Sequence, residues 1–176
     1  MRGFALVPLC LCAGCLFRPA PEGEPGALLA RGETLRRAGD FAEARRYYRA
    51  AMKGAPSTAL AEESRFCEAI SFEEEGQLRR AFDAYGKFME DFPESGEVEH
   101  ALLRQFETAG KAAARKGPSG GPFKADRIEE AVSLYEDIVT RRPEARLAME
   151  SLKAIGRVSF ENGYFFTATS AYRRYL

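Results

Sequence analysis

Residues 39–51 read Gly-Asp-Phe-Ala-Glu-Ala-Arg-Arg-Tyr-Tyr-Arg-Ala-Ala, and their pattern returns along the chain. A small residue at Ala44 is followed four positions later by Tyr48, and a proline closes the segment at Pro56. Related segments occupy residues 76–93, 131–143 and 163–175. The first two copies are 37 residues apart, as are the last two. A period in this range is typical of a solenoid of stacked helix pairs, which presents a surface to a partner.

The spacing within each copy is that of a helix. Ala44, Tyr48 and Ala51 are four and three residues apart, so they share one helical face. Alanine lets a neighbouring helix approach closely, and the following proline stops the helix. Three copies are also preceded by a glycine, which suits a left-handed turn after the previous helix: Gly39, Gly76 and Gly163. Each copy is therefore expected to be the second helix of a pair.

Small residues recur in the first helix of three pairs, twelve positions before the pattern alanine: Gly32, Ala69 and Gly156. They predict a close crossing of the two helices in a pair. Together these features resemble the tetratricopeptide repeat, although that repeat usually has a period of about 34 residues. We therefore expect an all-α, tetratricopeptide-type solenoid of about four helix pairs, with the last one incomplete. The expected units are residues 27–56, 59–93, 97–143 and 145–176.

The third unit is longer than the others, because Ala131 follows Ala81 by 50 residues instead of 37. The excess falls in a stretch rich in glycine and proline, which predicts an inserted loop near residues 117–124. A loop of this kind can be functional. A tolerated surface insertion is an equally good interpretation.

The N-terminus has the features of a processed segment and not of the fold. Its apolar stretch, residues 4–16, is well short of the roughly 20 residues that span a bilayer as a helix. Residues 11–15 read Leu-Cys-Ala-Gly-Cys, which resembles a bacterial lipoprotein signal: two small residues before a cysteine that becomes lipidated. We expect a signal peptide over residues 1–14, lipidation at Cys15 and a flexible tether over residues 15–26. The alternative is an ordinary secretory signal with incidental cysteines.

Composition and motifs exclude several classes of function. Lysine plus arginine equals aspartate plus glutamate at 26 each, so no net charge points to nucleic acid. No phosphate-binding glycine loop, paired metal ligands or nucleophile–base arrangement can be recognised, and the one histidine, His100, has no second ligand nearby in the sequence. We expect no enzymatic activity, no metal and no cofactor apart from the covalent lipid on Cys15. Cys67 is expected to pack as a small apolar residue on a helix.

Recognition of another polypeptide is the remaining chemistry. In tetratricopeptide arrays the first helix of each pair lines the concave face, and apolar residues flanked by both charge signs suit an extended or helical peptide. Transferring the helix offsets to this chain predicts nine partner-binding residues: Leu29, Arg36, Arg37, Phe66, Ile70, Leu103, Glu107, Arg157 and Phe160. The same offsets place five more charged or polar residues on that face: Glu33, Glu73, Glu74, His100 and Lys153.

The lipoprotein-like Cys15, the proline-rich tether and the 37-residue units occur together, and Phe-Pro-Glu-Ser follows the second copy at residues 92–95. This combination resembles the outer-membrane assembly lipoprotein BamD (YfiO-like) family. The resemblance implies a lipid-anchored protein on the periplasmic face of the outer membrane. It also implies two partners, unfolded β-barrel polypeptides and the central barrel subunit of the assembly machinery. Leu16, which follows the lipidated cysteine and is not aspartate, favours outer-membrane delivery by the usual sorting rule.

Two other functions stay open at this point. One is a different tetratricopeptide envelope scaffold, for example in cell division or peptidoglycan coordination. The other, disfavoured by the missing catalytic residues, is a secreted enzyme or enzyme subunit.

Members of the BamD-like family usually carry about five repeats, and four are visible here. The aromatic residues at Phe165, Phe166 and Tyr172 are therefore expected to lie near an open end, as in a fragment or beneath a partner.

Overall fold

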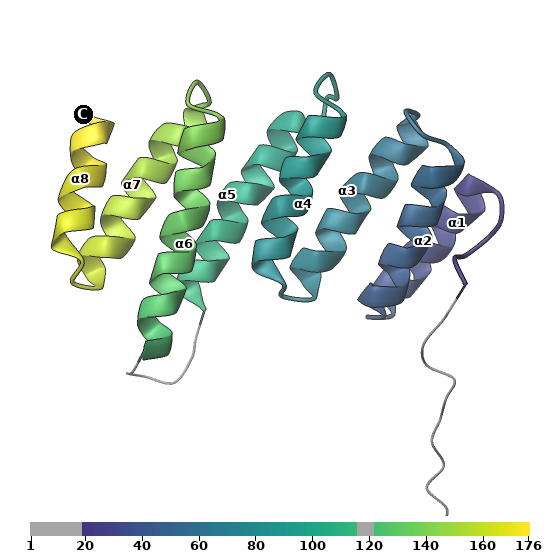
Figure 1. Cartoon of the computed structure of the whole chain (residues 1–176), viewed down its shortest axis with the longest axis horizontal. Helices are drawn as coiled ribbons and strands as arrows, with labels where there is room; N and C mark the ends of the chain where they lie inside the picture. The colour runs from purple at the N-terminus through teal and green to yellow at the C-terminus, as the bar shows by residue number, and fades with distance from the viewer. Residues whose placement is uncertain (1–18, 116–121) are drawn as a thin grey trace, which may run out of the picture.

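The computed structural model describes residues 19–115 and 122–176, and within them eight α-helices and no strands follow one another (Figure 1). The helices are α1 (Pro25–Arg37), α2 (Phe41–Gly54), α3 (Ala59–Glu74), α4 (Leu78–Asp91), α5 (Val98–Ala114), α6 (Pro122–Arg141), α7 (Arg146–Glu161) and α8 (Phe165–Tyr175). Figure 1 shows them side by side in chain order from α1 to α8. The predicted all-α solenoid of helix pairs is confirmed.

Each helix packs against the next one in the chain, and α1 also contacts α3 while α5 contacts α7. The odd-numbered helices therefore form one layer and the even-numbered helices the other. Contacts between neighbouring odd helices make their layer the tighter one, so the array is concave on that side. We call the surface presented by α1, α3, α5 and α7 the inner face.

The pattern alanines are the points where neighbouring helices touch, since Ala44, Ala81, Ala131 and Ala168 are all buried. The aromatic residue one turn later fills the space beside them, and Tyr48, Tyr85 and Tyr135 are buried as well. Beneath Tyr48 lies Gly32, where a β-carbon would come within 2.6 Å of the tyrosine ring. The helix crossings thus form where the spacing of small and aromatic residues predicts them.

The turns after α1, α3 and α7 have the predicted left-handed glycines, with φ of +83° at Gly39, +79° at Gly76 and +85° at Gly163. Only glycine adopts this conformation without strain. Asp40, next to Gly39, caps α2 by accepting a 3.3 Å hydrogen bond from the backbone N–H of Glu43. These short connections make the two helices of each pair antiparallel.

The start of α1 and a contact with α2 fall within the predicted flexible tether of residues 15–26. The helix begins at Pro25, because proline is favoured in the first helical turn. Before it, the carbonyl of Pro19 accepts a hydrogen bond from Arg46 of α2, so this part of the chain lies against the solenoid. The predicted signal peptide and Cys15 lie outside the described residues.

The inserted third unit lengthens its helices as well as its loop. Helix α5 has 17 residues and α6 has 20, against 16 and 14 for α3 and α4. Helix α6 begins at Pro122, inside the stretch predicted as a loop over 117–124, again because proline suits the start of a helix. Residues 116–121 lie outside the described part of the chain.

A candidate partner-binding face

Between α1 and α3, the inner face is occupied by a network of charged side chains. Tyr48 donates a 2.7 Å hydrogen bond to the carboxylate of Glu33. Arg36 lies 2.9 Å from the same carboxylate and 2.5 Å from that of Glu74 on α3. The hydrogen bond from Arg36 is the main reason that the pKa of Glu33 is lowered to about 2. Glu33 is therefore ionised at neutral pH, and its charge is balanced within the protein.

A second network connects α3 to α5. The side chain of Glu73 is only 2% exposed, and it accepts a 2.7 Å hydrogen bond from the hydroxyl of Tyr85. Arg104 lies 2.9 Å from the same carboxylate, and Lys111 pairs with its other oxygen. Arg104 also reaches Glu107, at 3.4 Å. Two helices separated by α4 in sequence are thus joined through one buried carboxylate.

Aromatic side chains fill the space beside the second network. The ring of Phe66 lies 5.6 Å from that of Tyr85, 5.2 Å from that of Phe88 and 5.3 Å from that of His100, measured between centroids. Ile70, one turn later on α3, packs partly buried against the same core. These contacts hold α3 against α4 and α5.

The structure divides the nine predicted partner-binding residues into two groups. Four have their side chains engaged within the protein: Leu29, which is buried in the first pair, Phe66 and Ile70, which pack against the core, and Arg36, which is held in the first network. Five present exposed side chains: Arg37, Leu103, Glu107, Arg157 and Phe160. Leu29 therefore offers no surface to a partner, because the pattern tyrosine and alanine of α2 pack over it.

The one described cysteine, Cys67, is packed against the first pair as expected. Burial is the main cause that raises the pKa of its thiol to about 12, and the negative charge of Glu33 acts in the same direction. A thiol held in this protonated state is a poor nucleophile and a poor metal ligand.

A hollow opens on the inner face between α5 and α7, with a volume of about 510 Å³. Its lining residues are Phe106, Glu150, Lys153, Ala154, Arg157 and Tyr172. Of these, Phe106, Glu150, Ala154 and Tyr172 were not predicted as partner-binding residues. Tyr172 could have been found, because it belongs to the repeat pattern and stands over Gly156, which is on the first helix of its pair. Phe106 could not, because its place depends on how the lengthened α5 and α6 pack.

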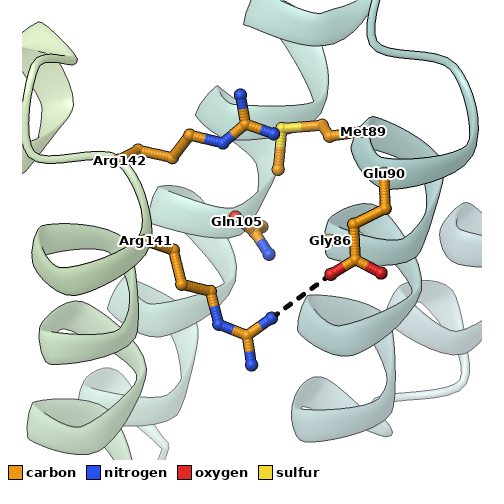
Figure 2. Close-up of a pocket in the computed structure, with 6 residues that line it drawn as sticks. All are labelled: Gly86, Met89, Glu90, Gln105, Arg141 and Arg142. Carbon is orange, nitrogen blue, oxygen red and sulfur yellow. Dashed lines mark ion pairs between the residues drawn. The ribbon is translucent and has the colours of Figure 1, made fainter.

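A second hollow of about 480 Å³ lies between α4 and α6, and its lining includes Gly86, Met89 and Gln105 (Figure 2). Figure 2 shows Arg141 crossing it towards Glu90, a pair 3.7 Å apart. Both side chains are 58% exposed, so the pair is well solvated and weak. The amide of Gln105 is already used, because it donates a 2.8 Å hydrogen bond to the carbonyl of Phe82. Arg142 also lines this hollow, and its side chain makes no ion pair or hydrogen bond with the described residues.

Among the side chains described, those of residues 19–115 and 125–176, no three histidine, cysteine, aspartate or glutamate residues are grouped so as to hold a metal ion. Over the same ranges, the helices are all too short or too polar to cross a bilayer.

Comparison with known families supports the assignment of the fold. The profile of the tetratricopeptide repeat matches residues 26–58 and 68–95, which contain nearly all of α1, the whole of α2 and α4, and the C-terminal part of α3. No curated protein matches the chain. The match and the helix-pair solenoid together support a tetratricopeptide protein, and such repeats generally act as non-catalytic scaffolds for protein partners.

Proposed function

We propose that this tetratricopeptide solenoid is a non-catalytic scaffold of the machinery that assembles β-barrel proteins in the outer membrane. In this proposal the protein is anchored through a lipid on Cys15 to the periplasmic side of the outer membrane. Its partners are unfolded barrel polypeptides and the central barrel subunit. The proposal is carried by the lipoprotein-like residues 11–15 placed ahead of a solenoid with an open inner face.

The chemistry of the inner face supports polypeptide binding. Leu103 on α5 and Phe160 on α7 are 42% and 60% exposed, although both are large apolar side chains. Charged residues of both signs surround them, including Glu107 and Arg157. Exposed apolar anchors within a charged rim are typical of protein interfaces. An unfolded barrel strand, with alternating apolar and polar side chains, matches this arrangement.

The test of polypeptide binding uses the double variant Leu103→Ala, Phe160→Ala. Both side chains are exposed, so the fold should be retained. Capture of a urea-unfolded outer-membrane barrel protein is expected to weaken about tenfold, measured as a dissociation constant by fluorescence anisotropy. Phe166→Ala is the matched control, because Phe166 is 89% exposed but lies on α8 in the other layer. Equal weakening in the control, or none in the double variant, would reject the inner face as the binding surface.

The assembly machinery itself is tested by purifying the detergent-solubilised protein with its partners. Recovery of a large β-barrel subunit supports the proposed function. Recovery of cell-division or peptidoglycan proteins in its place would favour the other envelope scaffold.

Membrane attachment has a separate test at Cys15. Intact mass spectrometry of the mature protein should show an N-terminal cysteine with three acyl chains, since a single chain anchors only weakly. Cys15→Ser should release the protein from the membrane fraction. Cys12→Ser is the control and should remain membrane-bound, because Cys12 lies within the expected signal peptide. An unmodified residue 15 in the mature protein would overturn the lipid anchor.

A further inference from the structure

The helix pairs can be compared with one another by the groups that surround the tyrosine of each repeat. In the first pair the Tyr48 hydroxyl is hydrogen-bonded to Glu33, and in the second pair the Tyr85 hydroxyl is hydrogen-bonded to Glu73. Each carboxylate also pairs with an arginine, at 2.9 Å in both pairs. The first two pairs thus share a tyrosine, a carboxylate and an arginine on the inner face. All of these groups are supplied by the chain itself.

The fourth pair has the same close approach of a glycine to the pattern tyrosine, but a different charge beside it. A β-carbon placed on Gly156 would lie 2.5 Å from the ring of Tyr172, as one on Gly32 would lie 2.6 Å from the ring of Tyr48. The residue after Gly32 is Glu33, whereas the residue after Gly156 is Arg157. One turn further along α7 stands Phe160. The position that contains a carboxylate in the first pair therefore contains a cation here.

The Arg157 side chain is exposed, and its charge is not neutralised by the part of the chain that the structure describes. It makes no ion pair or hydrogen bond with residues 19–115 or 125–176. The neighbouring Lys153 is already paired with Glu150 at 3.1 Å. Burial raises the pKa of Tyr135, and the positive charge of Arg157 partly opposes this, which places the guanidinium near that tyrosine.

The walls around this charge are aromatic. Phe106 of α5 and Tyr172 of α8 line the hollow of about 510 Å³ together with Arg157. Phe106 packs on Tyr135 with 5.3 Å between ring centroids, so this wall is held in place. A carboxylate that entered here would meet the planar guanidinium of Arg157, which can donate two parallel hydrogen bonds to it. An apolar residue next to that carboxylate in the bound polypeptide could cover the rings of Phe106 and Tyr172.

We infer that the hollow between α5 and α7 binds an acidic side chain of the partner polypeptide. The partner's glutamate or aspartate pairs with Arg157, as Glu33 pairs with Arg36 in the first pair, and an adjacent apolar residue covers Phe106. Charge complementarity selects this occupant, since Arg157 is the only charge in the hollow left without a partner among the described residues. The inference rests on the proposed function, in which the inner face binds polypeptides.

The experiment uses C-terminally amidated peptides that tile an outer-membrane barrel protein, so that every carboxylate is on a side chain. Peptides that bind the wild-type protein are remade with each glutamate changed to glutamine and each aspartate to asparagine. Replacing the recognised residue should weaken binding about tenfold, since a charge-assisted pair is involved. Arg157→Gln should bind both forms equally, and Arg157→Glu should prefer a lysine at the same peptide position. The control Arg173→Gln, an exposed arginine on α8, should behave like the wild type.

The possible outcomes separate this inference from the proposed function. Peptide binding that does not depend on any carboxylate overturns the inference and leaves polypeptide binding standing. Binding restored only by a free C-terminal carboxylate overturns it as well. No binding of any peptide overturns both. Binding to phosphatidylglycerol vesicles that is lost in Arg157→Gln would assign the hollow to a lipid headgroup instead.

Discussion

Changing Gly32 to alanine is expected to lower the free energy of unfolding by about 2 kcal/mol, although alanine is the better helix former. A β-carbon at this position would lie 2.6, 2.8 and 3.3 Å from three ring atoms of Tyr48. The ring is fully buried, and its hydroxyl is held by Glu33, so it has no free space to move into. The clash between the new β-carbon and the Tyr48 ring is relieved only if α1 and α2 move apart, which weakens the first helix pair.

The control for this prediction is in the same helix. A β-carbon on Gly26 would meet only Leu60, at an ordinary contact distance of 3.7 Å. Gly26→Ala should therefore leave stability unchanged or raise it slightly. Gly156→Ala should cost less than Gly32→Ala, because Tyr172 is 40% exposed and can swing towards solvent. Urea unfolding followed by circular dichroism gives all three values. A Gly32→Ala protein as stable as the wild type would contradict the close approach of α1 and α2 at Gly32 and Tyr48.

Glu73→Ala is expected to lower the free energy of unfolding by about 2–3 kcal/mol, the range for hydrogen bonds to a charged group. Its carboxylate is the common partner of Tyr85, Arg104 and Lys111, so one substitution removes every bond between α3 and α5 in this network. Because the Glu73 side chain is buried, its removal also leaves a cavity in the protein. Glu73→Gln should cost less, because the amide oxygen can still accept from Tyr85.

The matched control for Glu73 is Glu90→Ala. Glu90 also pairs with an arginine, but both side chains are 58% exposed and 3.7 Å apart. Solvent screens such a pair, so the change should stay within about 0.5 kcal/mol of zero. The comparison is again made by urea unfolding. If the two variants lose equal stability, the buried carboxylate does not connect α3 to α5.

The two halves of the inner face differ in how their charged side chains are paired. In the networks around Glu33 and Glu73, the charged side chains pair with one another. These ion pairs stabilise the arrangement of α1, α3 and α5. Around Arg157, no described residue provides the matching carboxylate. The same repeat therefore stabilises the solenoid at one end and leaves room for a partner's charge at the other.

The predicted binding residues show that a local sequence pattern predicts the exposure of a side chain less well than it predicts a helix. The helix offsets place a residue on a helix, and Leu103, Arg157 and Phe160 are indeed exposed. Offsets do not tell how deeply the next helix covers that position, and Leu29, Phe66 and Ile70 are covered to different degrees. Exposure is decided by neighbours far away in the sequence, so it cannot be derived from a local pattern.

Local patterns in the amino-acid sequence are enough to predict the helices, their pairing and their turns. These follow from short-range physics: residues three and four apart share a helical face, small residues allow close approach, and only glycine turns left-handed without strain. The tertiary structure alone decided which side chains pair across the inner face, as Arg36 does with Glu74, 38 positions away. It also decided that a hollow remains between α5 and α7, because such contacts depend on the relative placement of separate helices.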